Sequence, residues 1–208
     1  MTGGKPIMKK NGVAVSLFTL FAGLLFSGAA VGAQSATALG SPGTAAGCDG
    51  LPVIELPMPS REAEKSYLGL TGSGNFKIGQ IKAKVVIVEI YSLYCPHCQR
   101  MAAQVNDLYR AIERRADLKG KVKLIGIGAK NSEFEVDTFR EKYQVPFPLF
   151  PDAELELTQN FCAKGTPTFV GVKVDGKGFQ EKFYFGEGSF PDNQKFLDEI
   201  ARSSGLKK

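Results

Sequence analysis

The residues most able to do chemistry lie together in the stretch EIYSLYCPHCQR, from Glu89 to Arg100. It holds His97, the only histidine of the chain, between Cys95 and Cys98, two of its four cysteines. Two thiolates and an imidazole are ligands that zinc and copper accept. Two cysteines three positions apart can instead form and break a disulfide with other thiols. The motif therefore offers two chemistries, metal binding and thiol–disulfide exchange.

The position of Cys95 favours thiol–disulfide exchange. The β-branched run over residues 84–91 predicts a strand buried on both faces, and Pro96 suits the first position of a following helix. Cys95 would then lie at the helix N-terminus, where unpaired N–H groups and the helix dipole favour its thiolate. Cys98, one turn later on the same side, would attack a mixed disulfide formed on Cys95.

His97 has a predicted role in this exchange. An imidazolium or imidazole N–H near the thiolate would lower the pKa of Cys95 and stabilise the reduced pair. A dithiol stabilised in its reduced form is a stronger oxidant, so the motif favours donation of disulfides. The alternative is an exposed histidine without a role. A metal site would lack a fourth ligand, because the chain has no second C-x-x-C or histidine cluster. We therefore expect no metal and no cofactor.

Glu89 lies six positions before Cys95, inside the apolar strand. A carboxylate there is costly unless it has a partner or a function. Burial would raise its pKa and make it a proton acceptor for Cys98 during exchange. The alternative is a strand-end residue that reaches solvent. Alternation along the strand places Glu89 on the side of Tyr91 and Leu93, which favours the functional interpretation.

A third segment, GTPTF, begins at Gly165 and leads into a predicted strand. Proline at a strand start can simply mark the boundary. If the bond before Pro167 is cis, however, the backbone of Thr166 becomes free to pair with an extended substrate chain. Thr166 and Pro167 are therefore the candidate substrate-binding residues.

The elements around these residues predict an α/β domain. Apolar residues at helical spacing follow Cys95, a second strand is expected at residues 121–128, and a capping box at Ser132 predicts a helix to about Tyr143. Upstream, the apolar pieces YLGL and FKIGQI suit a hairpin or short strands.

Antiparallel strands followed by a helix are predicted for the second half of the domain. A Pro-punctuated segment and a short helix near residues 153–160 precede a hairpin whose turn is Asp175–Gly178. A closing helix ends before Gly205. The order β-α-β-α, then β-β-α, implies a mixed central sheet with helices on both faces.

The N-terminal 33 residues have the composition of a secretory signal peptide. Three lysines without an acid precede an apolar run and a small-residue exit at Ala33. We expect cleavage there and a periplasmic or otherwise extracytoplasmic location. An uncleaved membrane anchor is the alternative, because residues 13–33 could span a bilayer. Residues 34–60, rich in Ala, Gly, Ser, Thr and Pro, are predicted to be a flexible tether, and residues 61–208 a single domain.

The basic charge of the chain belongs largely to this N-terminal segment. Its three lysines account for part of the formal charge of +5, and +2 is left without them. No block of lysine and arginine remains, so we expect no nucleic-acid partner.

These features together resemble the thioredoxin superfamily over roughly residues 66–203. The stretch EIYSLYCPHC is similar to the active site of DsbA-type oxidases. The resemblance implies a thioredoxin-like fold and four site residues, namely the nucleophile Cys95, the resolving thiol Cys98, the buried acid Glu89 and a cis-proline at Pro167.

The spacing to Pro167 departs from the DsbA pattern. The 72 positions after Cys95 are too few for the helical insertion of typical DsbA proteins and too many for a bare thioredoxin. One helix together with the segment FREKYQVPFPLFPD would fill this gap as a short insertion, which is more similar to TlpA/ResA-like and peroxiredoxin-like branches. Those branches usually carry Trp where this chain has Tyr94. A peroxidase motif would need proline at Val88, so we expect no peroxidase activity.

The other two cysteines are Cys48, in the predicted tether, and Cys162, five positions before Pro167. If Cys95 pairs with Cys98, these two could form a structural disulfide that ties the tether to the domain. An accessory redox pair that relays electrons, or an intermolecular bond through Cys48, are the alternatives.

The sequence thus predicts an exported thiol–disulfide oxidoreductase that acts on protein thiols or disulfides as an oxidase. A membrane or soluble redox partner would recharge its dithiol. A reductant or isomerase of the same fold is one alternative. The other is a thioredoxin-fold module that binds a soft metal such as copper.

Overall fold

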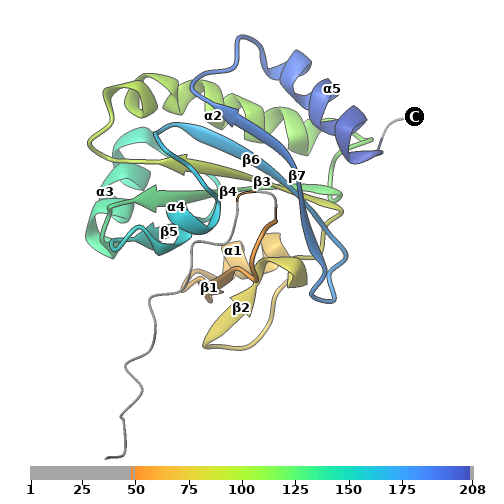
Figure 1. The fold of residues 1–208 in the computed structure, drawn as a ribbon, viewed down its shortest axis with the longest axis horizontal. Helices are drawn as coiled ribbons and strands as arrows, with labels where there is room; N and C mark the ends of the chain where they lie inside the picture. Colours follow the sequence, from red (N-terminus) through yellow and green to blue (C-terminus); the bar gives the residue numbers. More distant parts are fainter. Residues whose placement is uncertain (1–47, 49, 207–208) are drawn as a thin grey trace, which may run out of the picture. The chain divides into compact units, whose positions relative to one another are not determined.

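The structure is a computed structural model that describes Cys48 and residues 50–206 (Figure 1). The predicted signal peptide or anchor at residues 1–33 and most of the predicted tether lie outside the described residues. No helix within the described residues combines the length and the apolar character needed to cross a membrane.

A five-stranded mixed sheet forms the centre of the fold. Its strands are β3 (Val85–Tyr91), β4 (Val122–Ala129), β5 (Leu149–Asp152), β6 (Thr168–Val174) and β7 (Gln180–Glu187). The order across the sheet is β5-β4-β3-β6-β7 (Figure 1). β3, β4 and β5 run parallel to one another, whereas β6 is antiparallel to both β3 and β7. β3 is central and all of its residues are buried, as its β-branched sequence predicts.

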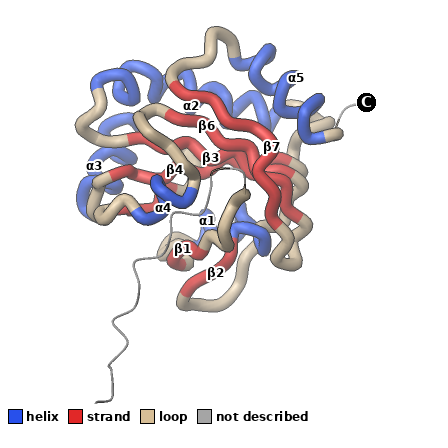
Figure 2. Tube along the Cα trace, in the orientation of Figure 1, coloured by secondary structure: helices blue, strands red, loops and turns tan. Residues whose placement is uncertain are grey.

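Helices cover both faces of this sheet. They are α1 (Glu62–Leu68), α2 (Pro96–Arg114), α3 (Glu133–Tyr143), α4 (Glu156–Asn160) and α5 (Asn193–Ser204). α2 and α5 lie on one side, and α1 lies on the other side with a small sheet of β1 (Glu55–Pro57) and β2 (Asn75–Lys77) (Figures 1 and 2). Each face has its own apolar core, one built with α2, α3 and α5 and the other with β1, β2 and α1. The predicted mixed sheet flanked by helices is confirmed.

Three helix signals in the sequence are confirmed. The apolar stripe of α2 is buried. Ser132 and Glu135 form a reciprocal capping box at the start of α3. Gly205 ends α5 with a φ of 80°, the left-handed conformation that glycine adopts without strain.

Two upstream segments differ from the prediction. Residues 55–57, expected in the tether, form β1, because Ile54 and Leu56 are fully buried against the sheet and β1 pairs with β2. The piece YLGL was expected in a hairpin or strand, but its first two residues end α1. The helix-forming sequence EAEKSYL outweighs the short apolar run, and Gly69 at φ 68° stops the helix.

The Pro-punctuated segment completes the sheet. FREKYQVPFPLFPD contributes the end of α3 and then β5, which pairs with β4 at the edge of the sheet. Proline is tolerated there because an edge strand has one side of its backbone free of the ladder. α3, β5 and α4 therefore lie between β4 and the proline-bearing strand β6, the part of the chain where a short insertion was expected.

Candidate active site

Cys95 is the N-cap residue of α2, the helix of the candidate site. β3 ends at Tyr91, and α2 starts at Pro96 with Cys95 as its N-cap residue. The backbone N–H of Cys98 donates to the Cys95 sulfur at 3.4 Å, so the thiol occupies the place of a capping oxygen. Pro96 stands at a position whose N–H has no helical partner in any case. The strand-to-helix junction expected from the sequence is present.

Thr166 lies directly against this thiol. The Thr166–Pro167 peptide bond is cis. β6 pairs with β3, with Thr168 opposite Ile90, so the start of β6 lies beside the end of β3. The S–H group of Cys95 donates to the carbonyl oxygen of Thr166 at 3.3 Å. The fold thereby joins two motifs that are 71 residues apart in the chain.

The environment of Cys95 favours its thiolate. Partial burial alone would raise the pKa of Cys95, but hydrogen bonds from the Thr166 side chain and from the backbone N–H groups of Cys98 and His97 outweigh it. The net pKa is lowered. His97 itself is exposed. It acts on Cys95 here through its backbone, and the effect of its imidazole stays a prediction.

Cys98 has the opposite character. Its side chain is fully buried among the residues of the α2-side core. Burial, followed by hydrogen bonding with Cys95, raises the pKa of Cys98 far above its ordinary value, and the nearby Glu89 carboxylate adds repulsion. Cys95 and Cys98 are both free thiols, and they differ strongly in acidity.

Glu89 is buried rather than solvent-exposed, since only 2% of its surface is accessible. It stands in the middle of the sheet, opposite Gly126 of β4 and Phe169 of β6. Alternation places it on the same face of β3 as Tyr91, which packs in the same core as Cys98. Burial, and secondly the charge of Cys95, raise the pKa of Glu89 to about 8. The carboxyl can therefore exchange a proton near neutral pH.

Asn131 supports the candidate site and was not predicted from the sequence. It is fully buried just after β4. Its side-chain oxygen accepts a hydrogen bond from the N–H of Leu93 at 2.8 Å, and its amide nitrogen donates to the Ser92 hydroxyl at 3.4 Å. Asn131 thus fixes the two residues that lead to Tyr94 and Cys95. An asparagine between a strand and a capping box is a weak local signal, because its partner is 38 residues away.

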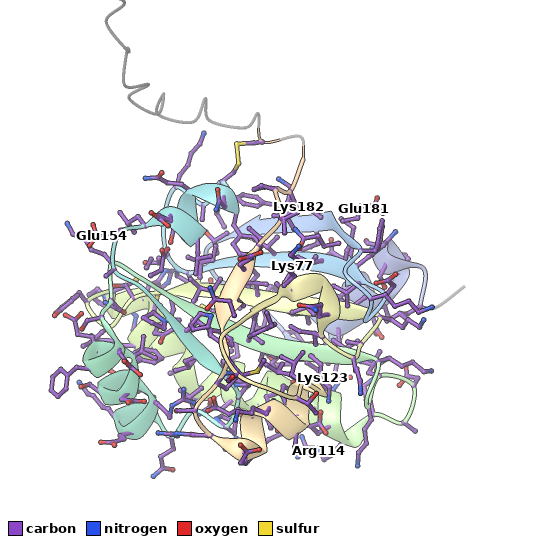
Figure 3. All side chains as sticks on the ribbon, turned by 90° about the horizontal axis from the view of Figure 1, so that it is seen from below. Lys77, Arg114, Lys123, Glu154, Glu181 and Lys182 are labelled. Carbon is purple, nitrogen blue, oxygen red and sulfur yellow. A yellow bond between two sulfur atoms is a disulfide. The ribbon has the colours of Figure 1, made fainter. Side chains whose placement is uncertain are left out.

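Cys48 and Cys162 form a disulfide, with their Cα atoms 5.8 Å apart. It is the yellow bond that joins the first described residues to the loop after α4 (Figure 3). No group of three or more His, Cys, Asp or Glu side chains in the described part of the chain is arranged to hold a metal ion.

Known proteins share the sequence and the fold. The AhpC/TSA family matches residues 55–182, more than half of the chain. The thiol-disulfide oxidoreductase ResA of Halalkalibacterium halodurans is 22% identical over 103 residues, which are 50% of this chain and 56% of that protein. ResA of Bacillus thuringiensis subsp. konkukian is 24% identical over 124 residues, 60% of this chain and 68% of that protein. The match thus spans little more than half the length of the first relative.

Among solved structures, StoA from Bacillus subtilis superposes with a TM-score of 0.51 at 20% identity. The superposition covers 73% of this chain and 98% of StoA. At this identity the likeness shows the fold, and the expected thioredoxin-like architecture is confirmed. The family match over more than half of its length shows that this chain belongs to the AhpC/TSA family.

Proposed function

We propose that this chain is a thiol–disulfide oxidoreductase that exchanges disulfides with proteins outside the cytoplasm. The unlike pair of thiols carries the proposal, because a nucleophile of lowered pKa, Cys95, is followed one turn later by the buried thiol Cys98. The names of the ResA relatives support the same reaction type. The signal-like composition of residues 1–33 supports export.

In one direction the dithiol reduces a substrate disulfide. The Cys95 thiolate attacks one substrate sulfur, the substrate S–S bond breaks, and the other substrate sulfur leaves as a thiolate that takes up a proton. Cys98 then gives its proton to Glu89 and attacks the Cys95 sulfur of the mixed disulfide. The Cys95–Cys98 bond forms and the second substrate thiolate leaves. Two electrons have passed to the substrate, and the same steps reversed oxidise a substrate dithiol.

The Thr166 backbone is the proposed substrate contact. In the free dithiol, the Thr166 carbonyl accepts the Cys95 S–H group. Once Cys95 is part of a mixed disulfide, this proton is gone and the carbonyl can accept a backbone N–H of the substrate. An extended chain would then pair with Thr166 beside the reacting sulfurs. Nucleophilic attack and substrate pairing are thereby coupled.

We further propose that oxidation of substrates is the physiological direction. Hydrogen bonds that favour the Cys95 thiolate stabilise the reduced dithiol, and a stabilised dithiol makes the disulfide form a stronger oxidant. We expect the Cys95–Cys98 couple to have a potential nearer to about −120 mV, as in strong oxidants, than to about −270 mV, as in thioredoxin. Equilibration with glutathione buffers, followed by mass mapping of the Cys95–Cys98 peptide, measures it. A value near that of thioredoxin would make the protein a reductant.

Replacement of Cys98 by serine tests the exchange function itself. Without the resolving thiol, mixed disulfides between Cys95 and substrate proteins should accumulate in the oxidising compartment of the expressing cell. We expect covalent adducts that dithiothreitol releases and that mass spectrometry identifies. The Cys95→Ser/Cys98→Ser double variant is the matched control and should form none at this site. If Cys98→Ser yields no more adducts than the double variant, proteins are not the substrates.

A further inference from the structure

The Cys48–Cys162 disulfide stands next to the loop that contacts the active-site thiol. Cys162 follows α4, and four residues later the chain reaches Thr166, whose carbonyl accepts the Cys95 S–H group. β7 ends at Glu187, which lies opposite Thr168 at the start of β6. The end of β7 and the loop before β6 therefore lie at the same end of the sheet. A change in the position of Cys162 can therefore reach Cys95 through the few residues that lead to Thr166.

The loop is fixed on both sides of Cys162. The buried carboxylate of Asp152 accepts the N–H groups of Leu157 and Thr158 at 3.0 and 2.8 Å, which holds the start of α4. At the other end, the hydroxyl of Thr168 donates to the carbonyl of Gly165 at 2.7 Å. Cys162 lies between these anchors with a φ of 62°, a conformation that non-glycine residues rarely adopt. The disulfide is therefore attached to a residue whose backbone conformation is rare for a residue with a side chain.

Cys48 is held to a different part of the fold. The ammonium of Lys182 donates to the carbonyl of Cys48 at 2.5 Å. The side chain of Gln180 bonds to the carbonyl of Pro52 and accepts the N–H of Ile54. β7 therefore holds Cys48 and the residues up to Ile54 in place. Because Cys48 is bonded to Cys162, the loop between α4 and β6 is held to β7 as well. The two cysteines are 114 residues apart in the chain.

The disulfide is open to small molecules. A hollow of about 390 Å³ is lined by both cysteines together with Lys164, Lys182, Phe185 and Glu187. Cys48 is exposed and Cys162 is partly exposed. The two lysines outnumber the single acid Glu187 in this lining, so a net positive charge would stabilise a thiolate that leaves the broken bond and make it a better leaving group. Figure 3 shows Lys182 near the yellow S–S bond.

We propose that the Cys48–Cys162 disulfide is a reducible clamp on the loop that carries Thr166, and that its reduction by a low-molecular-weight thiol weakens Cys95 as a nucleophile. A thiolate attacks the sulfur of Cys48, the more exposed of the two residues, the S–S bond breaks and Cys162 leaves as a thiolate. A second thiolate attacks the resulting mixed disulfide and releases Cys48. Two small thiols become one disulfide, and the chain gains two thiols.

The consequence for Cys95 follows from its contacts. The backbone oxygen of Thr166 lies 3.3 Å from the Cys95 sulfur, and at this position the Thr166 side chain supplies a hydrogen bond that helps to lower the pKa of Cys95. A loop released at Cys162 holds Thr166 less firmly, so less of Cys95 is thiolate at mildly acid pH. This inference rests on the proposed function only in taking Cys95 as the nucleophile. Its test does not depend on that function, because iodoacetamide alkylates Cys95 without any protein substrate.

The first experiment compares the wild type with the Cys48→Ser/Cys162→Ser variant. We expect iodoacetamide to alkylate Cys95 of the reduced variant roughly fivefold more slowly at pH 6, with the pH profile displaced upward. Asp192→Ala is the control for lost stability, because it removes the side-chain cap of α5 and leaves the disulfide and its anchors on β7 in place. It should lower stability without moving the Cys95 profile. Equal profiles for the wild type and the double serine variant would overturn the clamp.

A second measurement needs no substitution at the clamp. In the Cys95→Ser/Cys98→Ser background, millimolar glutathione should reduce the Cys48–Cys162 bond, seen as two maleimide additions by mass spectrometry. In the wild type, graded dithiothreitol gives chains with only the active site reduced and chains with both pairs reduced. Peptide mapping should show slower Cys95 alkylation in the fully reduced chains. The proposal would be refuted if glutathione does not reduce the Cys48–Cys162 bond, or if Cys95 is alkylated at the same rate whether this bond is intact or reduced. Either result would refute it even if exchange with proteins is confirmed.

Discussion

Replacement of Glu89 by glutamine is expected to stabilise the folded protein, and the gain should grow with pH. Glutamine keeps nearly the shape of the protonated acid and carries no charge. Glu89 is buried, and burial raises its pKa to about 8 in the folded state, against 4.5 for the free side chain. Ionisation is therefore much harder in the folded protein than in the unfolded chain.

The direction of the effect follows from proton linkage. Between pH 4.5 and pH 8 the unfolded chain has released the Glu89 proton, whereas the folded protein still holds it. The folded state binds more protons in this window, so its stability falls as pH rises. At about 1.36 kcal/mol per pKa unit, the loss from pH 5 to pH 9 is about 4 kcal/mol. Glu89→Gln removes this term and leaves the other titrating groups in place.

Urea unfolding from pH 5 to pH 9 measures the difference. Both chains should carry Cys95→Ser and Cys98→Ser, which removes active-site oxidation and leaves burial as the cause. The two free energies of unfolding should be within about 1 kcal/mol of each other at pH 5, and their difference should grow by about 4 kcal/mol between pH 5 and pH 9. Glu181→Gln, an exposed acid on β7, is the matched control and should show no such divergence. Parallel curves for Glu89→Gln would show that the carboxyl has an ordinary pKa.

Local sequence signals predicted the elements that place these groups. The β-branched run before Glu89 gave β3, the CPHC motif gave the start of α2, and the Ser132 capping box gave α3. Each signal is complete within a few residues, because strand burial, a helix cap or a turn is decided by neighbours in the chain. The burial of Glu89 could be predicted for the same reason.

Features that depend on distant partners could not be predicted in this way. β1 has only three residues and is stabilised by pairing with β2 and by the burial of Leu56, neither of which its own sequence reveals. Asn131 acquires its role from Leu93, which only the parallel pairing of β3 and β4 brings near. The same holds for the contact between Thr166 and Cys95. Side-chain chemistry was therefore easier to predict than the positioning that makes it effective.

Glu89 destabilises the folded protein, and we expect it in return to speed the resolving step, the attack of Cys98 on the mixed disulfide. Cys98 is a poor nucleophile at neutral pH because burial raises its pKa far above the ordinary value. The Glu89 carboxyl lies on the face of β3 that packs in the same core as Cys98. With a pKa of about 8, it can accept the proton of the Cys98 thiol as the sulfur attacks. Positioned proton transfer contributes about 100-fold or more to such steps. We expect Glu89→Gln to slow attack by Cys98 roughly 100-fold.

Dithiobis(nitrobenzoate) separates the two steps in one experiment. Attack by Cys95 releases one thionitrobenzoate, and attack by Cys98 on the mixed disulfide releases the second. Glu89→Gln should slow the second release while changing the first by less than about threefold, because Cys95 owes its thiolate to hydrogen bonds at the start of α2 and from Thr166. Glu181→Gln should leave both unchanged.

The pH dependence identifies the base. In the wild type the second release should rise as Glu89 loses its proton and level off above about pH 8. In Glu89→Gln it should keep rising through the alkaline range, since only the high pKa of Cys98 then limits the thiolate. A variant that keeps both the rate and the plateau of the wild type would assign the proton to another acceptor. The stability cost of the buried acid would then have no counterpart in catalysis.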